Sequence, residues 1–379
     1  MNSPRIAIVG AGIGGLACAR VLDLKGLRAT VFEREDSADS RSQGGSLDMH
    51  SDTGQAALRA AGLLERFHEL ARPEGQEGRT LDRAATVLRH HVPGPDERDT
   101  PEIDRGQLRG LMLETLPPGM VQWGRGVDGV TAVDGGARIA FADGTTADFD
   151  LVIGADGAWS RVRPAVSEAT PIHTGVNFVE FSFDDADRAH PDLARMVGGG
   201  TMTALAPNRC MAIQRNSNGH LRVYAAFWDA PDWHAAAGID MGDARAVRSH
   251  LLTVFEGWDD RLLDFVRRTE SGFINRPLFA LPAPHDWSHV PGVTLLGDAA
   301  HLMPPLGVGA NLAMLDGTDL AASIAAASTV DEGVRVYEDL MLPRAGRAAK
   351  LVGDGLRVML GPEAPESALR FYDQMSAED

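Results

Sequence analysis

The feature that most constrains the fold is a glycine-rich loop close to the N-terminus. Apolar residues at 5–9 predict a buried parallel strand, and Gly10-Ala11-Gly12-Ile13-Gly14-Gly15 follows it directly. A helical pattern and a second predicted strand at 28–33 complete a βαβ unit. In such a loop the first glycine permits a tight turn, the second lets a pyrophosphate approach the main chain, and the third lets the helix pack on the strand. We therefore expect a dinucleotide to bind at Gly10, Gly12, Gly14 and Gly15.

The residue that ends the second predicted strand is acidic. Glu33 lies 23 residues after Gly10, where a carboxylate can bind a ribose 2′-OH in a dinucleotide-binding fold. Both NAD and FAD contain this ribose. The acidic residue therefore does not distinguish NAD from FAD.

A second motif, close to residue 300, favours FAD. Apolar residues at 292–296 predict a strand that ends in Gly297-Asp298, and a loop with prolines and glycines leads into an alanine-rich helix near Asn311. A carboxylate at the end of a strand can bind the ribityl hydroxyls of a long dinucleotide. The positive end of the helix suits the N1–C2=O region of a flavin, where negative charge settles on reduction. We expect FAD, with Asp298 at its ribityl chain.

A third motif follows the predicted strand at 149–154. In Gly154-Ala155-Asp156-Gly157-Ala158-Trp159-Ser160-Arg161-Val162-Arg163, Asp156 and Arg161 can serve the pyrophosphate or a second nucleotide. A turn capped by the aspartate explains the same pattern, so both interpretations stay open.

The order of the predicted strands and helices indicates an α/β protein. A Rossmann-like FAD-binding domain of the glutathione-reductase type carries an inserted antiparallel-sheet substrate domain and closes with C-terminal helices. A helix is expected at about 52–71. Alternating patterns at 178–183 and 221–227 predict the inserted sheet, whereas 73–101 suggests turns. The expected boundaries are 1–72, 102–168 and 277–328 for the FAD domain, 73–101 and 169–276 for the substrate domain, and 329–379 for the closing helices.

Composition narrows the partners and the location. The 379 residues carry a net charge of −17, which disfavours nucleic acid and anionic membranes as partners. No apolar stretch is long enough to span a bilayer, so the cytoplasm is the expected location. Two distant cysteines give no pattern for a disulfide framework or a metal site. We expect a monomer that binds no metal.

The three motifs, in this order and spacing, resemble the single-component (class A) FAD-dependent monooxygenases of the aromatic-hydroxylase type. The closer resemblance is to the tetracycline-inactivating monooxygenases and covers nearly the whole chain. The blocks that carry it include Val31-Phe32-Glu33-Arg34, Gly44-Gly45-Ser46-Leu47-Asp48, Pro101-Glu102-Ile103-Asp104-Arg105, Leu108-Arg109 and Gly297-Asp298-Ala299-Ala300-His301.

This resemblance implies roles for individual residues. Glu33 and Arg34 would hold the adenosine of FAD, Asp48 would contact the flavin, and Arg105 would contact the pyrophosphate or ribityl region. Arg41 matches a position implicated in NADPH binding. The main chain of the loop would surround the isoalloxazine at Gly307, Gly309, Ala310 and Asn311. No side chain is expected to act as a catalytic acid or base, because His50 and His301 are better interpreted as loop or helix-cap residues.

Two departures from that family bear on the substrate. The family's loop Pro-Pro-x-x-Gly-Gln-Gly-x-Asn is one residue shorter here and lacks the glutamine, since Pro304-Pro305-Leu306-Gly307-Val308-Gly309-Ala310-Asn311 takes its place. The positions expected to face the substrate do not match those of the tetracycline enzymes, so tetracycline is only one candidate. These positions are Glu180, Thr201, Ala212, Arg222 and Pro305.

The expected function is hydroxylation of an aromatic or polycyclic small molecule, of tetracycline, polyketide or indole type. NAD(P)H would reduce FAD, and a flavin C4a-hydroperoxide formed with O2 would transfer the oxygen atom. Only one dinucleotide fingerprint is present, that is, a GxGxxG between a predicted strand and a predicted helix, so NADPH would bind transiently. A flavin-dependent reductase and a non-catalytic flavin- or small-molecule-binding protein remain alternatives. A halogenase is disfavoured because the chain has no Trp-x-Trp.

Overall fold

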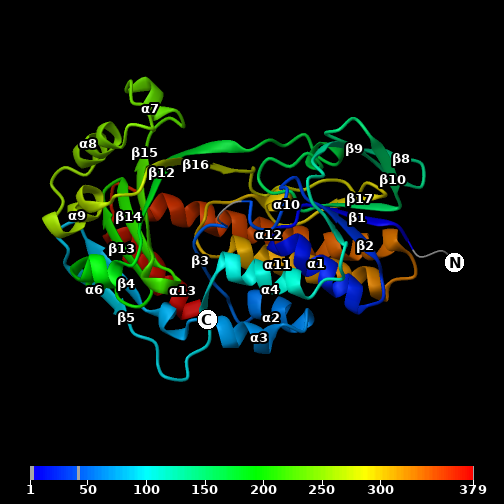
Figure 1. The fold of residues 1–379 in the computed structure, drawn as a ribbon, viewed down its shortest axis with the longest axis horizontal. Coiled ribbons are helices and arrows are strands. Elements are labelled where there is room, and N and C mark those ends of the chain that lie inside the picture. The colour runs from blue at the N-terminus through cyan, green and yellow to red at the C-terminus, as the bar shows by residue number, and fades with distance from the viewer. Residues whose placement is uncertain (1–3, 41–42, 379) are drawn as a thin grey trace. The chain divides into compact units, whose positions relative to one another are not determined.

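The structure is a computed structural model that describes residues 4–40 and 43–378 (Figure 1). The chain forms two compact units, each assembled from three segments. The first unit comprises Met1–Ala71, Arg105–Ile172 and Phe279–Val352, and the second comprises Arg72–Asp104, His173–Leu278 and Gly353–Asp379. The stretch 329–379, which we expected to be one group of closing helices, is divided between the units after Val352.

The first unit is built on a five-stranded parallel sheet whose strands are almost wholly buried. β1 and β11 expose none of their four residues, as a parallel sheet covered on both faces requires. The order across the sheet is β17 (Val293–Leu295), β11 (Leu151–Gly154), β1 (Ile6–Val9), β2 (Ala29–Phe32) and β7 (Val121–Gln122).

Two helices of the first unit pack unusually closely. α1 (Ile13–Leu24) lies beside α11 (Gly309–Ala326) (Figure 1). A Cβ at Gly14 would lie 2.6 Å from the Ala313 carbonyl oxygen, and a Cβ at Gly317 would lie 2.4 Å from the Gly14 oxygen. Glycine is therefore required on both helices where they meet.

Further helices and a small sheet complete the first unit. The helix expected at about 52–71 is two helices, because the chain turns at Gly62, whose φ is +69°. The helices are α2 (Gly54–Ala60), α3 (Leu64–Leu70), α4 (Arg105–Glu114), α10 (Asp298–His301) and most of α12 (Val330–Met359). The small antiparallel sheet contains β8 (Val127–Val133), β9 (Gly136–Phe141) and β10 (Thr146–Phe149).

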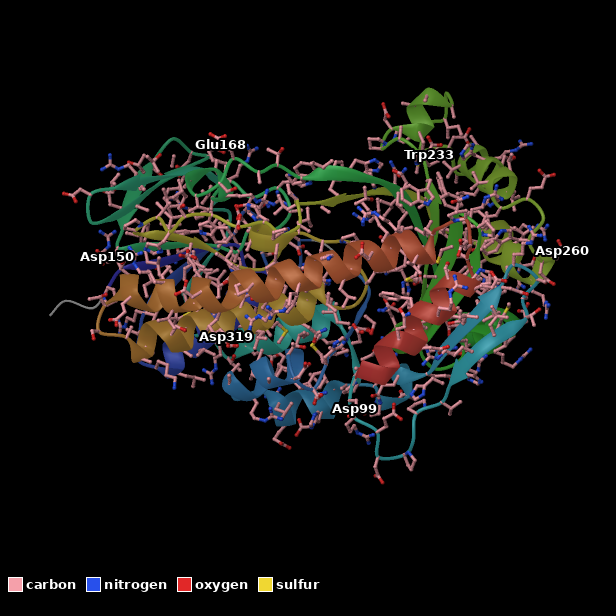
Figure 2. The ribbon with its side chains drawn as sticks, turned by 180° about the vertical axis from the view of Figure 1, so that it is seen from behind. Asp99, Asp150, Glu168, Trp233, Asp260 and Asp319 are labelled. Carbon is pink, nitrogen blue, oxygen red and sulfur yellow. The ribbon has the colours of Figure 1, made fainter. Side chains whose placement is uncertain are left out.

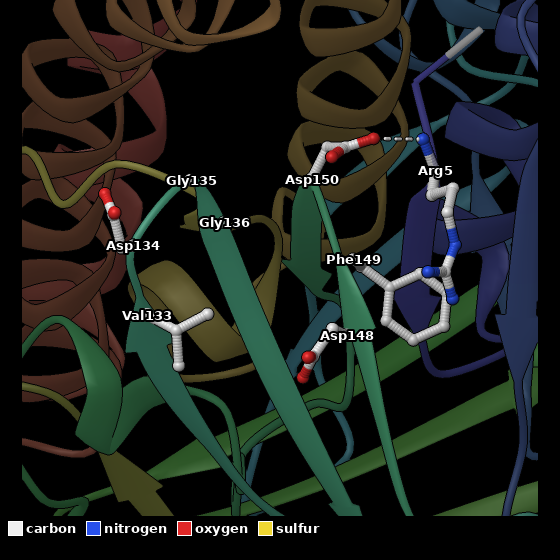
Figure 3. Close-up of a pocket in the computed structure, with 8 residues that line it drawn as sticks. All are labelled: Arg5, Val133, Asp134, Gly135, Gly136, Asp148, Phe149 and Asp150. Carbon is white, nitrogen blue, oxygen red and sulfur yellow. Dashed lines mark hydrogen bonds between the residues drawn. The ribbon is translucent and has the colours of Figure 1, made fainter. Parts of the chain in front are cut away.

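A shallow pocket of about 190 Å³ lies at the ends of this small sheet (Figure 3). The Arg5 main-chain N–H donates to Asp150 Oδ2 at 2.7 Å, and the Arg5 guanidinium lies 5.2 Å from the centre of the Phe149 ring. Two of the carboxylates that line this pocket serve structural contacts, because Asp148 pairs with Arg138 and Asp150 accepts from Arg5. The lining residues are Arg5, Val133, Asp134, Gly135, Gly136, Asp148, Phe149 and Asp150.

The second unit is built on a seven-stranded sheet. The order is β16 (Ile274–Ala280), β12 (Ile172–Phe183), β15 (Leu221–Trp228), β14 (Arg209–Arg215), β13 (Thr201–Ala206), β4 (Gly78–Asp82) and β5 (Val87–His91). The pairs β12–β15, β15–β14, β14–β13 and β4–β5 are antiparallel, and the pair β13–β4 is parallel.

One face of this sheet is covered by helices and forms the core of the unit. Alternate strand residues such as Phe181 and Val223 pack there with helix residues such as Phe265. Trp233, which is 2% exposed, stacks on His250 in the same layer (Figure 2). The helices are α5 (Ala186–Ala189), α6 (Pro191–Val197), α7 (Trp233–Ala236), α8 (Ala244–Val254) and α9 (Asp260–Arg268).

The segment 73–101 was wrongly predicted as turns. It contributes the hairpin β4–β5 to the edge of the large sheet. All five residues of β5 are exposed, so the strand lacks the apolar alternation by which strands are recognised in a sequence. The α/β fold class itself is confirmed.

Further elements are two short strands, β3 (Ser46–Asp48) and β6 (Glu102–Asp104), and the helix α13 (Glu366–Glu378).

Candidate cofactor-binding site

The carboxyl ends of four parallel strands meet at one edge of the first unit's sheet. β1 lies between β2 and β11, so the chain leaves β1 toward one side and later returns on the other. Such a reversal of strand order opens a crevice that binds ligands in α/β folds. Main-chain bonds hold the loops side by side: the Gly10 N–H donates to Phe32 O at 2.8 Å, and the Ala155 N–H donates to Val9 O at 2.8 Å.

The glycines of the first loop have different structural roles. Gly10 has φ +108°, and a Cβ there would lie 2.4 Å from the Ala155 oxygen. A Cβ at Gly15 would lie 2.3 Å from the Gly10 oxygen. A Cβ at Gly12, by contrast, would meet no atom within 4 Å, although Gly12 is the N-cap of α1. Gly10, Gly14 and Gly15 therefore allow the packing, and Gly12 leaves open the space that a pyrophosphate needs at a helix N-terminus.

Glu33 and a buried arginine fix the shape of this loop. The Glu33 carboxylate accepts hydrogen bonds from the N–H groups of Ala11, at 2.8 Å, and Glu35, at 3.1 Å. Arg109, which is 4% exposed, donates from Nε to Ala11 O at 3.0 Å and from Nη1 to Ala38 O at 2.9 Å. These bonds hold Glu33 at the end of β2 beside the open loop, as a ribose-binding carboxylate must be.

Arg109 has a structural role that the sequence reasoning did not assign. The available signal was an arginine on the apolar side of α4, next to the buried Leu108 and close to the buried Met112. Arg34 is exposed at the end of the same region, and its adenosine role stays a prediction. Arg41 lies outside the described residues.

Asp298 begins α10 with an exposed carboxylate. It forms no hydrogen bond through its side chain among the residues that the structure describes, and Gly309 Cβ, if present, would lie 4.0 Å from its Oδ1. The main chain below it is held by Arg163, which is 3% exposed and donates to Asp298 O at 3.1 Å and Ala299 O at 2.8 Å. A fixed main chain with an open carboxylate fits the expected contact to ribityl hydroxyls.

Behind this carboxylate lies a buried charge cluster. Asp316, which is 1% exposed, accepts from His301 Nε2 at 2.6 Å, from Arg344 at 3.0 Å and from the Gly297 N–H at 3.1 Å. Burial works against the charge on His301, but the Asp316 carboxylate raises the pKa of the imidazole above its usual value. Burial likewise opposes the charge on Asp316, but His301 and Arg344 lower its pKa.

Arg344 also bonds to Asp319, which Figure 2 labels, at 2.7 Å. The cluster therefore joins α10, α11 and α12. His301 and Asp316 are buried in this cluster, whereas Arg344 and Asp319 are partly exposed. The structure thus places His301 in a buried ion pair, and the expectation that it is not a catalytic base stays a prediction.

The shortened loop is tied to β3 by Asn311, which is 1% exposed. Its side-chain oxygen accepts from the N–H groups of His50, at 2.9 Å, and Gly54, at 3.1 Å. Its amide donates to Asp48 O at 2.7 Å and to Gly307 O at 3.0 Å. The Asn311 side chain therefore serves the loop itself, and only its main chain is available to a flavin.

Asp48 and Gly307 lie together at the same place. Gly307 has φ +88°, and a Cβ there would lie 3.0 Å from Asp48 Oδ2. The Asp48 carboxylate also bonds to His50 Nε2 at 3.1 Å and is 39% exposed. Ala310 is half-buried and Pro305 is exposed. The structure thus brings Asp48 beside the loop that was expected to surround the isoalloxazine, and these contacts with flavin stay predictions.

Asp156 has the geometry of a turn cap. Its carboxylate accepts from Ser160 Oγ at 2.6 Å and from the Arg161 N–H at 2.7 Å, and burial raises its pKa. These bonds favour the structural interpretation that the sequence left open. Arg105 starts α4, and its N–H donates to Gly45 O at 3.1 Å. Cofactor contacts by Asp156 and Arg105 stay predictions.

Four residues predicted to face the substrate share one face of the second unit's sheet. Glu180 pairs with Tyr224, and Tyr224 pairs with Ala212, so these three lie in one row. Arg222 and Thr201 lie in the next row, joined through Gln214. The residues that alternate with them belong to the helix-covered core. The structure thus brings Glu180, Thr201, Ala212 and Arg222 together on the face opposite that core, while Pro305 belongs to the other unit.

The residues of the first unit fit a bound FAD. Gly12 provides an open approach to the main chain at the N-terminus of α1, Glu33 is held at the end of β2, and Asp298 presents a carboxylate without a protein partner among the described residues. A Cβ at Gly10 or at Gly15 would require the main chain around this site to move.

Comparison with known proteins agrees with this fit. The model of the "FAD binding domain" family matches residues 4–213 and 286–351. Monooxygenase penA of Penicillium thymicola is 30% identical, with 93% of this chain and 94% of penA covered. The 3-amino-4-hydroxybenzoate 2-monooxygenase PtmB3 of Streptomyces platensis is 29% identical, with 100% of this chain and 94% of PtmB3 covered.

Solved structures share the fold. HpxO of Klebsiella pneumoniae, complexed with FAD and uric acid, has a TM-score of 0.80 at 20% identity, with 99% of this chain and 93% of HpxO covered. The tetracycline destructase Tet(51) has a TM-score of 0.72 at 20% identity, with 100% of this chain and 96% of Tet(51) covered.

The fold and site define a flavoprotein of the FAD-dependent monooxygenase class. The chain belongs to the FAD binding domain family, and the cofactor and the family expected from the sequence are confirmed. No helix among the described residues is long and apolar enough to cross a membrane.

Proposed function

We propose that the protein inserts one oxygen atom of O2 into an aromatic or polycyclic small molecule, with NADPH as the reductant. The observation that carries the proposal is the open, rigid edge of the parallel sheet, where Gly12, Glu33 and Asp298 fit FAD. Bound FAD supplies the redox and oxygen-activating chemistry, and the protein binds and orients it.

The residues of the chain have separate parts in this proposal. Gly12 admits the pyrophosphate, Glu33 and Arg34 bind the adenosine end, and Asp298 binds the ribityl chain. Asp48 and the main chain from Gly307 to Asn311 lie against the flavin ring. Arg105 and Asp156 complete the cofactor contacts, and Arg41 is proposed to meet NADPH, which binds only transiently.

The substrate class is proposed from two supports. PtmB3 acts, by its name, on a hydroxylated aromatic acid, and the HpxO structure contains uric acid, a planar heterocycle. The polar face of the second unit's sheet, with Glu180, Thr201, Ala212 and Arg222, offers side chains suited to a ring with polar substituents. Pro305 is proposed to contribute from its loop. Tetracycline remains one member of this class, because the destructases share the fold at only 20% identity.

A cytoplasmic monomer that binds neither nucleic acid nor membrane is part of the same proposal. The net charge of −17 supports the absence of polyanionic partners.

The test is a reaction of the purified yellow protein with NADPH, ¹⁸O2 and a panel of aromatic acids, quinolones, indoles and tetracyclines. We expect at least one compound to accelerate NADPH oxidation and to yield a product that contains one ¹⁸O atom. A reduced product without ¹⁸O would instead establish the reductase alternative. If no compound accelerates oxidation while FAD binds, a non-catalytic flavin-binding function would replace the proposal.

A further inference from the structure

Three charged residues from three neighbouring strands meet on the polar face of the second unit's sheet. Glu180 of β12, which is 7% exposed, accepts from Arg222 of β15 through Oε1 and from Arg276 of β16 through Oε2, the latter at 2.9 Å. Neither arginine forms an ion pair with a second carboxylate in the described part of the chain. One carboxylate thus faces two guanidinium groups, and one positive charge is left uncompensated.

The two arginines keep hydrogen-bond donors to spare. The Nε–H of Arg222 is buried and has no partner among residues 4–40 and 43–378. A buried donor without an acceptor costs about 1–3 kcal/mol, so such donors normally indicate a missing partner. Arg276 is 54% exposed, and its hydrogen bond to Glu180 uses Nε. Its planar fork is therefore free to bind an acceptor that arrives from solution.

An aromatic pair lies directly beside these charges. Tyr224 is the cross-strand partner of Glu180, and Phe178 lies two residues before Glu180 on the same face. The two rings are 5.7 Å apart between centroids. Ring surface next to a cationic cluster is the combination that binds a planar molecule with an acidic substituent.

We propose that this face selects substrates that carry a carboxylate on the aromatic ring, with Arg222 and Arg276 as the anion-binding residues. The inference rests on the proposed function, and it narrows the substrate class to aromatic acids. Glu180 is a positioning residue: both of its oxygens are engaged, so it cannot bind a cation, and it fixes the two guanidinium groups before the substrate arrives. Fixed donors lose less conformational entropy on binding.

The test compares each acid with its neutral amide in equilibrium binding to the FAD-loaded protein without NADPH. The probes are benzoate and benzamide, their 4-hydroxy forms, and the corresponding carboxylates and carboxamides of naphthalene and quinoline. Flavin absorbance and calorimetry are the readouts. We expect at least one acid to bind at least 10-fold more tightly than its amide. If no acid is preferred, the inference is wrong.

Variants of single residues test which side chains cause the preference for acids over amides. Arg276→Gln, at an exposed position that should not disturb folding, is expected to bring the acid-to-amide ratio close to 1. Arg222→Lys keeps the charge but removes Nε–H and should reduce the ratio several-fold. The matched control is Arg188→Gln on α5, where the side chain is 85% exposed and pairs with Asp185. This control should keep the wild-type ratio, and an equal loss in Arg276→Gln and Arg188→Gln would indicate a general charge effect and overturn the assignment.

Failure here and failure of the proposed function give different results. Selective acid binding that depends on Arg276, without ¹⁸O in any product, would contradict oxygen insertion and leave the anion site intact. Oxygen insertion into neutral compounds with no effect of Arg276→Gln would do the reverse.

Discussion

The glycine loop of the first unit and the polar face of the second unit's sheet differ in the groups that they offer to a ligand. The loop offers main-chain groups, and the sheet offers side chains. In the loop, main-chain groups are exposed, and side chains such as Glu33 and Arg109 hold the loop from behind. On the sheet, the main chain is engaged in strand pairing, and side chains such as Arg222 and Tyr224 are presented. A Cβ at Gly15 would meet main chain at 2.3 Å, whereas β13, β14, β15 and β16 of the sheet carry a side chain at every position.

This difference teaches why the cofactor was easier to identify than the substrate. A surface of main-chain atoms restricts the sequence to glycine at fixed spacings, and that restriction is visible in one short segment. A surface of side chains on regular strands accepts many sequences. The predictions below test the comparison, beginning with the largest expected effect.

Gly15→Ala should disrupt the first unit. The added Cβ would lie 2.3 Å from the Gly10 oxygen, a contact that only a main-chain shift can relieve. Overpacking of this kind costs roughly 3 kcal/mol, which lowers the unfolding midpoint by about 6–12 °C. Thermal unfolding of the apoprotein measures it. An unchanged midpoint would show that the loop is more adaptable than this comparison assumes.

Gly12→Ala should separate cofactor binding from folding. No atom lies within 4 Å of the added Cβ, so the apoprotein should unfold at the wild-type temperature. FAD affinity should fall by about 100-fold, because the methyl group takes the space through which the pyrophosphate approaches the main chain. Gly110→Ala on α4, which is equally open, is the matched control and should bind FAD normally. Normal FAD binding by Gly12→Ala would move the pyrophosphate elsewhere.

Asp298→Ala should weaken FAD binding without unfolding the protein. The carboxylate is exposed and has no hydrogen-bond partner among the described residues, so its removal leaves no buried group unpaired. Loss of a charge-assisted hydrogen bond to the ribityl chain corresponds to about 1.5–3 kcal/mol, or roughly 10- to 150-fold in affinity. Fluorescence titration of the apoprotein with FAD checks the value. Full flavin occupancy in the purified variant would remove Asp298 from the site.

The His301–Asp316 pair should make stability depend on pH. The pKa of His301 is raised from 6.5, so its contribution is complete below pH 6.5 and is lost as pH rises through the higher folded value. The pKa of Asp316 is lowered from 3.8, so its contribution is complete above pH 3.8 and is lost as pH falls through the lower folded value. The pair therefore contributes fully between about pH 4 and 6.5.

His301→Asn should accordingly lose more stability at pH 6 than at pH 9, with about 1.5–3 kcal/mol lost at pH 6. Urea unfolding of wild type and variant at both values measures the difference. His91→Asn, at a half-exposed position on β5, is the control. The same loss at both pH values would contradict the charged pair.

Ala212→Ser should have only a small effect on stability. Ala212 lies on the polar face between Thr203 and Tyr224, so an added hydroxyl should change the free energy of unfolding by no more than about 0.5 kcal/mol. Ligand selectivity should change more, by about threefold. Met211→Ser, one residue away but 0% exposed in the core, is the contrast and should cost several kcal/mol. Comparable losses in the two variants would show that the two faces are not different in kind.

Local patterns were sufficient where neighbours in sequence are neighbours in space. The βαβ unit, the loop glycines and the end of β17 were predicted from short segments, and their positions in the fold agree. The hairpin β4–β5 was missed because an exposed edge strand has no apolar alternation. The helix at 52–71 was predicted as one because a single glycine at 62 is weak evidence for a break.

Buried charged residues were the main omission in the first unit. Arg109, Arg163 and Asp316 are charged side chains, which usually face solvent. Each is buried because its partners come from distant segments: Arg109 binds the loop at Ala11, Arg163 binds Ala299, and Asp316 binds His301 and Arg344. A charge is stable in the interior only with such partners, and these depend on the fold.

The sequence by itself determined the fold class and the FAD-binding family, because the glycines that a main-chain surface requires are contiguous in the chain. Only the tertiary structure decided that Glu180, Arg222 and Arg276 form one cluster. These residues are up to 96 positions apart, and they meet because the pairing of β12, β15 and β16 sets which side chains share a face. Strand register is a property of the whole sheet, and a shift of one residue would send each of these side chains to the opposite face.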